Sequence, residues 1–69
     1  MLWLVIKGAS HQIISSNIHS EKGKHQLWVE RPNGKTLKVR ESGNLQDVQE
    51  VKNAIDYAVK HKHSSLELE

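Results

Sequence analysis

The alternation of apolar and polar positions divides the chain into four strand-like runs followed by one helix-like run. A strand places successive side chains on opposite faces, so a period of two indicates a strand that is buried on one side. The strand-like runs cover Leu2–Lys7, Gln12–Ser20, Lys24–Arg31 and Lys35–Glu41. We therefore expect four strands in the order of the sequence.

Helix signals begin at Asn44, a residue type that caps helix N-termini well, and Asp47 stands three residues later as a possible reciprocal partner. Apolar residues then recur at helical spacing at Val48, Val51, Ile55 and Ala58 or Val59. This spacing predicts one helix, from about Leu45 to Lys62, with a single apolar stripe.

The stretch RPNGK predicts the turn between the third and fourth strands. Pro32 and Asn33 suit the centre of a type I turn, and Gly34 suits the left-handed position that follows as a bulge. In this register Val29 lies opposite Leu37 and Leu27 lies opposite Val39. A two-residue turn at Asn33-Gly34 would mix apolar and polar side chains on each face, so we favour the bulged register.

The same reasoning predicts a two-residue turn at Lys22-Gly23, which places Ile18 opposite Leu27 and Ser16 opposite Val29. One face is then apolar, and Ile14 joins it. The other face collects Ile13, Ser15, Asn17, His19, Gln26, Trp28, Glu30, Thr36, Lys38 and Arg40.

These elements predict an α+β fold: a four-stranded antiparallel meander with one C-terminal helix packed on one face, the Leu27/Val29 face. The opposite face stays open. The first strand is apolar on both sides, with Leu2, Leu4 and Ile6 on one side and Trp3 and Val5 on the other. The pattern does not decide which set meets the helix.

Length and composition limit the classes of protein that are possible. A chain of 69 residues forms one domain at most, and we assign it to residues 1–63, with a tail at 64–69. We leave open that the Leu-Glu pairs of the tail come from an expression vector.

The absence of cysteine excludes disulfides and thiolate metal sites and fits a reducing compartment. The apolar run at residues 1–6 is too short for a membrane span, so we expect a cytoplasmic protein.

The charges are unevenly placed along the chain. Residues 1–40 hold seven Lys or Arg and two acids, whereas residues 41–69 hold three and six. Bases stack on aromatic rings while cations hold phosphates, and this makes Trp28, Lys38 and Arg40 a candidate site for DNA or RNA. Lys24, Arg31 and Lys35 would add electrostatic attraction. The leading hypothesis is therefore a small binding module that acts as a dimer and binds nucleic acid through the open face.

A rival hypothesis uses the same face for protein. The residues Trp3, Val5, Ile13 and Trp28 would form a homodimer interface or a docking surface, because small chains often need a second copy for stability. In a third interpretation Trp28 only packs under the stem of Lys38.

Catalytic and metal-binding patterns are weak, and we expect a non-enzymatic protein without metal or cofactor and without an evident small-molecule substrate. The five histidines do not follow the spacing of a zinc site.

The tripeptide GKH at the start of a strand, followed by a hairpin and a helix, resembles the HicA toxins, which would imply a nuclease using His25. That family begins with a helix, however, and this chain begins with an apolar strand. In architecture alone, the expected sheet and helix are similar to the DNA-binding arm domains of phage-type integrases.

Overall fold

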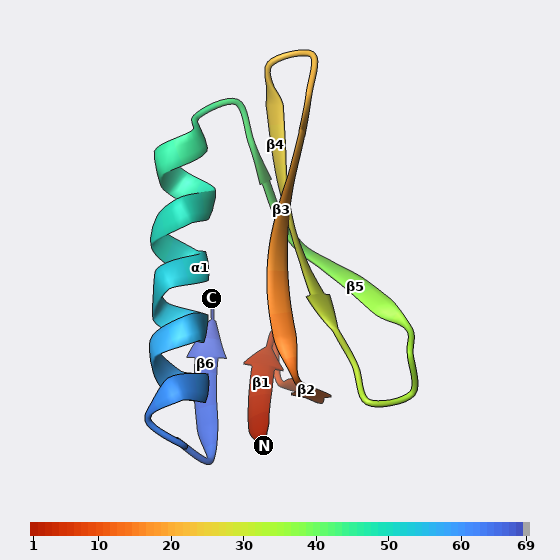
Figure 1. Cartoon of the computed structure of the whole chain (residues 1–69), viewed down its shortest axis with the longest axis vertical. Helices are drawn as coiled ribbons and strands as arrows, with labels where there is room; N and C mark the ends of the chain where they lie inside the picture. Colours follow the sequence, from red (N-terminus) through yellow and green to blue (C-terminus); the bar gives the residue numbers. More distant parts are fainter. Residues whose placement is uncertain (69) are drawn as a thin grey trace.

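The computed structural model describes residues 1–68, which form six strands and one helix (Figure 1). In chain order the elements are β1 (Leu2–Ile6), β2 (Ala9–Ile13), β3 (Ser15–Glu21), β4 (Lys24–Glu30), β5 (Thr36–Ser42), α1 (Leu45–Lys60) and β6 (Ser65–Leu68). The strands form two three-stranded sheets, ordered β2-β1-β6 and β3-β4-β5. The α+β class is confirmed, and α1 packs against both sheets.

The β3-β4-β5 sheet is an antiparallel meander, as predicted for this part of the chain. The Lys22-Gly23 turn is confirmed, with φ of 51° and 79°, the pair of positive values that a type I′ turn requires. Ile18 lies opposite Leu27 and Ser16 opposite Val29. The β4–β5 turn is also confirmed: the Arg31 N–H donates to the Lys35 carbonyl at 2.8 Å, and Gly34 has φ 83°.

A β-bulge interrupts the pairing of β4 with β5. Val29 lies opposite Leu37 as predicted, but the register shifts between Leu27 and Trp28. Leu27 consequently lies opposite Arg40 rather than Val39, and Val39 is the extra residue on β5. The predicted register is therefore right near the turn and wrong beyond the bulge.

The predicted second strand is two strands, β2 and β3, which separate at Ile14 and belong to different sheets. β2 pairs with β1 through a two-residue turn at Lys7-Gly8, whose φ values of 50° and 82° match those of Lys22-Gly23. The prediction of a single four-stranded meander is wrong in this respect, because β1 is the centre of a separate sheet.

The separation at Ile14 reverses the predicted burial of two neighbouring residues. Ile13 is 0 % exposed and belongs to the core, whereas Ile14 is 43 % exposed. The assignment of Ile13 to the open face is therefore wrong. The face of β1 is also settled, because Leu2 and Leu4 are buried in the core while Trp3 is exposed.

The predicted tail contains β6, which pairs in parallel with β1 so that Leu66 lies opposite Leu4 and Leu68 opposite Ile6. Both β6 leucines pack against the core. Residues 65–68 are thus part of the folded structure, and Glu69 of the tail lies outside the described residues.

The helix begins where the capping pattern predicts and ends two residues earlier than expected, at Lys60. The Asn44 Oδ1 accepts from the Gln46 N–H at 2.9 Å. Asp47 does not reach back to the Asn44 backbone. Its carboxylate instead accepts from the Ser42 hydroxyl at 2.9 Å, and that hydroxyl accepts from the Asn44 N–H at 3.0 Å.

A polar cluster fastens α1 to β3. Ser16 is almost fully buried, and its hydroxyl donates to Asp56 Oδ1 at 2.8 Å. Lys52 Nζ lies 2.7 Å from Asp56 Oδ2 and 3.1 Å from the Ser16 carbonyl oxygen. The buried Ser16 hydroxyl therefore has a hydrogen-bond partner, and the Lys52–Asp56 ion pair of α1 contacts β3 at Ser16.

The separation of β2 from β3 at Ile14 predicts that truncating Ile13 costs much more folding stability than truncating Ile14. We expect Ile13→Ala to lower the free energy of unfolding by about 2–4 kcal/mol, because it leaves a cavity in the core. The matched change Ile14→Ala removes an exposed side chain and should cost less than about 1 kcal/mol. Urea denaturation of both variants measures the difference, and equal losses would contradict the strand boundary at Ile14.

Candidate functional site

The predicted nucleic-acid site centres on Trp28, which the structure places half-buried on the middle strand of the β3-β4-β5 sheet. Its pairing partners are Asn17 on β3 and Lys38 on β5. Two pairs further along, and on the same face of β4, Gln26 lies opposite Glu41. We refer to Asn17, Gln26, Trp28, Lys38 and Glu41 as the Trp28 face.

A chain of polar contacts occupies this face. Trp28 Nε1 donates to Gln26 Oε1 at 3.0 Å, and Gln26 Nε2 donates to Glu41 Oε2 at 2.7 Å. Lys38 Nζ lies 3.9 Å from Glu41 Oε1. The indole N–H and the Lys38 ammonium are therefore both engaged with groups of the protein itself.

The β-bulge decides which charge stands beside Trp28. In an uninterrupted ladder Arg40 would lie opposite Gln26, on the same face as Trp28. The extra residue moves Glu41 into that position and leaves Arg40, which is exposed, opposite the buried Leu27. The predicted grouping of Trp28, Lys38 and Arg40 on one regular face is thus altered, and a carboxylate takes the expected place of a guanidinium.

Glu41 is held in its charged form by these neighbours. The hydrogen bond from Gln26 lowers the pKa of the Glu41 carboxyl, and the positive charge of Lys38 lowers it further. The Glu41 side chain is exposed to solvent, so the shift reports the local arrangement and carries little stability.

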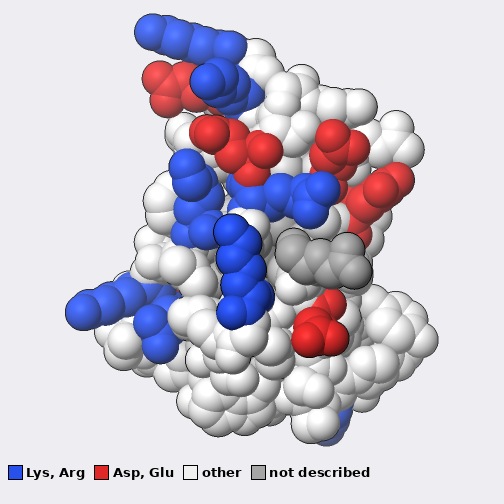
Figure 2. Space-filling view, turned by 180° about the vertical axis from the view of Figure 1, so that it is seen from behind, with Lys and Arg blue, Asp and Glu red and all other residues white. Residues whose placement is uncertain are grey.

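The remaining basic residues of the predicted site lie at opposite ends of β4. Lys24 begins β4 beside Glu21, in a shallow hollow that Lys22 and Gln26 also line. Arg31 and Lys35 flank the turn that follows the other end of the strand. On the side opposite to Figure 1, basic and acidic side chains are mixed in the upper part of the molecule (Figure 2). The lower part carries few charges, and it is the end where β1 begins and α1 ends.

The predicted protein interface is divided by the fold. Trp3 and Val5 share the outer face of β1, where Trp3 is 46 % exposed and Val5 is half-buried. Their partners on the neighbouring strands are polar: Gln12 and Ser10 on β2, and Ser65 and Glu67 on β6. Trp28 lies on the other sheet and Ile13 in the core, so neither belongs to this surface.

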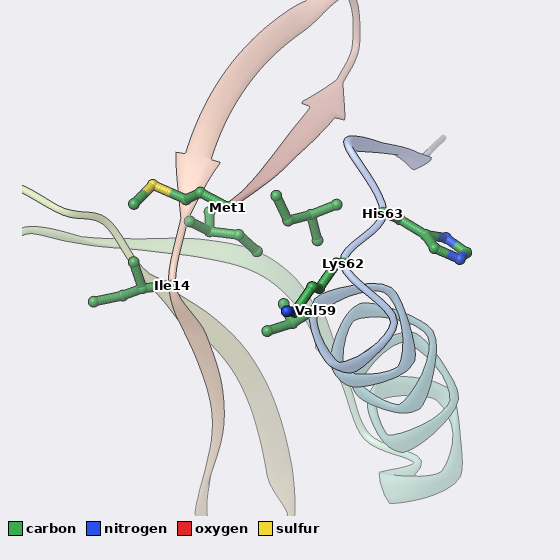
Figure 3. A pocket seen from close by; sticks show the side chains of 7 residues that line it. Met1, Ile14, Val59, Lys62 and His63 are labelled. Atoms are coloured by element: carbon green, nitrogen blue, oxygen red, sulfur yellow. The ribbon is translucent and has the colours of Figure 1, made fainter.

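A pocket that the sequence did not predict lies where β1 begins and α1 ends (Figure 3). Its volume is about 240 Å³, and it is lined by Met1, Leu2, Ile13, Ile14, Val59, Lys62 and His63. Leu2 and Ile13 are buried, whereas Met1, Ile14 and Val59 are exposed. The one sequence signal for it is the pair Ile13-Ile14, which breaks the alternation of the strand.

The histidines make local contacts. The His61 ring lies against Tyr57 at a tilt of 31° with ring centroids 4.0 Å apart, and His63 and Tyr57 meet edge to face with centroids 5.8 Å apart. A ring nitrogen of His25 lies 2.6 Å from the Ser20 hydroxyl.

Within residues 1–68, no three His, Asp or Glu side chains lie close enough together to hold a metal ion. In the same residues, the one helix is too short and too polar to cross a membrane.

Comparison with protein-family models, with characterised proteins and with solved structures finds no match for this chain.

The contacts of Glu41 predict its titration. Because its pKa is depressed in the folded state, its stabilising contribution is present above the unfolded pKa and is lost as the pH falls through the folded pKa. We expect Gln26→Leu to raise the pKa of Glu41 more than Lys38→Met does, since the hydrogen bond is the larger cause. Carboxyl-carbon NMR titration of the two variants measures both shifts, and the reverse order would contradict the contact network.

Proposed function

We propose that this protein is a small non-enzymatic module that binds another protein chain through the exposed apolar side chains of β1 and the adjoining pocket. The observation that carries this proposal is that exposed apolar residues line the pocket, namely Met1 (67 % exposed), Ile14 and Val59, while Trp3 is exposed on the outer face of β1, whose first residue, Leu2, also lines the pocket. On the Trp28 face, by contrast, the polar groups of Trp28, Gln26 and Glu41 bind one another.

The surroundings of Trp3 suit a protein contact. Aromatic residues and methionine are enriched in the buried centres of protein interfaces, while polar residues form the rim. Trp3 stands on the middle strand of its sheet, between Gln12 and Ser65 on the two outer strands. The small domain gains stability when such a residue is covered, at about 25 cal/mol per Å² of apolar surface.

The first partner to consider is a second copy of the chain. Two copies related by a two-fold axis would bring the outer faces of their β1 strands together, so that each Trp3 meets the same surface on its partner. This arrangement places Trp3 at the centre of the contact and the polar residues Ser10, Gln12, Ser65 and Glu67 at its edge.

The two tryptophans provide a matched test of this proposal. We expect Trp3→Asp to shift the light-scattering mass from dimer to monomer at concentrations where the unchanged protein is dimeric, because a charge cannot be buried at the interface without a partner. Trp28→Asp, on the other sheet, should leave the mass unchanged. A protein that is monomeric throughout, or a dimer that survives Trp3→Asp, would exclude self-association through this face.

Nucleic-acid binding through the Trp28 face is the second candidate function. Two observations support it: Trp28 pairs directly with Lys38, and seven of the ten Lys and Arg residues precede residue 41. A base could stack on the half-buried ring while Lys38 and the basic turns contact phosphates. Glu30 and Glu41 on the same sheet oppose this role.

A salt series with short single- and double-stranded oligonucleotides tests this second candidate. Phosphate contacts require affinity to fall steeply as salt rises, and Lys38→Ala should reduce that slope by about one. Glu41→Gln should strengthen binding, because it removes a negative charge beside Trp28. The absence of binding at low salt would exclude this function.

A further inference from the structure

The pocket at the end of α1 has an apolar floor and a positively charged rim. Leu2 and Ile13 form the buried floor, and the apolar side chains of Met1, Ile14 and Val59 surround the opening. In the part of the chain that the structure describes, the ionisable side chains that line the pocket are Lys62 and His63. In Figure 3, Lys62 lies beside Val59 on the side of the pocket, while the His63 ring points away from it.

Lys62 reaches this position through an unusual backbone conformation. The His63 N–H donates to the Ala58 carbonyl at 2.9 Å, and the Lys62 N–H lies 3.2 Å from the Val59 carbonyl oxygen. These two contacts define a Schellman motif, in which the residue at the Lys62 position is usually glycine. Lys62 has φ 57°, a left-handed value that is unfavourable for a side chain with a Cβ atom. A lysine therefore occupies a position where glycine would be the more stable choice.

The size of the pocket limits its occupant. Sites for small molecules usually enclose about 300–1,000 Å³ and cover most of the ligand. The pocket measures about 240 Å³ and opens between exposed side chains, so one bulky aliphatic side chain fits it better than a whole cofactor. Apolar anchors of this kind, filling a pocket, supply most of the energy of many protein contacts.

The charge at the rim adds a second requirement. None of the pocket-lining residues within 1–68 carries a carboxylate that could face Lys62, and a negative group beside the anchor would complement its ammonium. We propose that this pocket binds an acidic peptide segment of a partner protein, with one leucine-like side chain on Leu2 and Ile13 and a neighbouring carboxylate at Lys62. The inference rests on the proposed protein-binding function and names the chemistry of the bound segment.

The test uses a fluorescein-labelled pentapeptide in which four aspartates surround one central leucine. We expect saturable binding to the full chain by fluorescence anisotropy. Replacement of the leucine by alanine should weaken binding at least tenfold, because the anchor is lost. Replacement of the aspartates by asparagines should also weaken it. Equal affinities for the three peptides would overturn the proposal.

Lys62→Gly separates binding from stability. It removes the rim charge and relieves the left-handed backbone, so the melting temperature should stay the same or rise while peptide affinity falls about two- to fivefold. Lys60→Ala removes the same charge from the last turn of α1 without touching the lining residues, and it should bind the peptide as the unchanged protein does. Equal weakening by both variants would show a general charge effect and overturn the site.

Methyl NMR of the complex distinguishes this site from the Trp3 surface. Peptide binding should shift the signals of Leu2, Ile13 and Val59, which line the pocket, and leave Val5 unchanged. Shifts at Val5 without shifts at the pocket would overturn the pocket proposal while leaving a role for the outer face of β1. The mass measurement with Trp3→Asp decides that role independently, because Trp3 is not a lining residue.

Discussion

One helix has to cover the apolar sides of two sheets, and the rest of the structure follows from that constraint. Val48, Ile55 and Ala58 are the buried residues of α1, and they share a core with Leu2, Leu4 and Ile13 from one sheet and Leu27 and Val29 from the other. A single flat four-stranded sheet would leave part of this set uncovered. The separation of β2 from β3 at Ile14 turns both apolar faces towards the same helix, and the Ser16–Lys52–Asp56 cluster fixes where the helix sits.

Local signals in the sequence were sufficient for the helix and for two turns. Asn44, Lys22-Gly23 and Pro32-Asn33-Gly34 each act within a few residues, and the structure confirms all three. The predictions were wrong where the structure depends on packing between residues that are far apart in the sequence. Ile13 and Ile14 fit a strand equally well, and only the competition for the core selects Ile13. The pairing of β6 with β1 joins segments about sixty residues apart and has no local signal.

On the candidate surfaces, a shift of one residue in strand pairing changes which charge lies at a given position. One extra residue in β5 exchanges Arg40 for Glu41 beside Trp28, and it converts an expected cationic face into an internally paired one. An alternating pattern cannot reveal that insertion, because Val39 packs towards the core with or without the bulge. The pocket could not be predicted for a similar reason: it forms where the end of β2 at Ile13 meets the turn that follows α1 and contains Lys62, and these segments are far apart in the sequence.

The parallel pairing of β1 with β6 also sets an order of assembly during synthesis. β1 is the central strand of its sheet, yet only its β2 edge can be paired while the ribosome is still making the intervening residues. The Lys7-Gly8 hairpin and the β3-β4-β5 meander consist of contacts between residues that are near each other in the sequence, so they can form early. The second edge of β1, in contrast, can pair only after residues 65–68 have been made. Until then the backbone of β1 offers one open edge beside exposed leucines, and a nascent chain in that state is open to pairing with another strand.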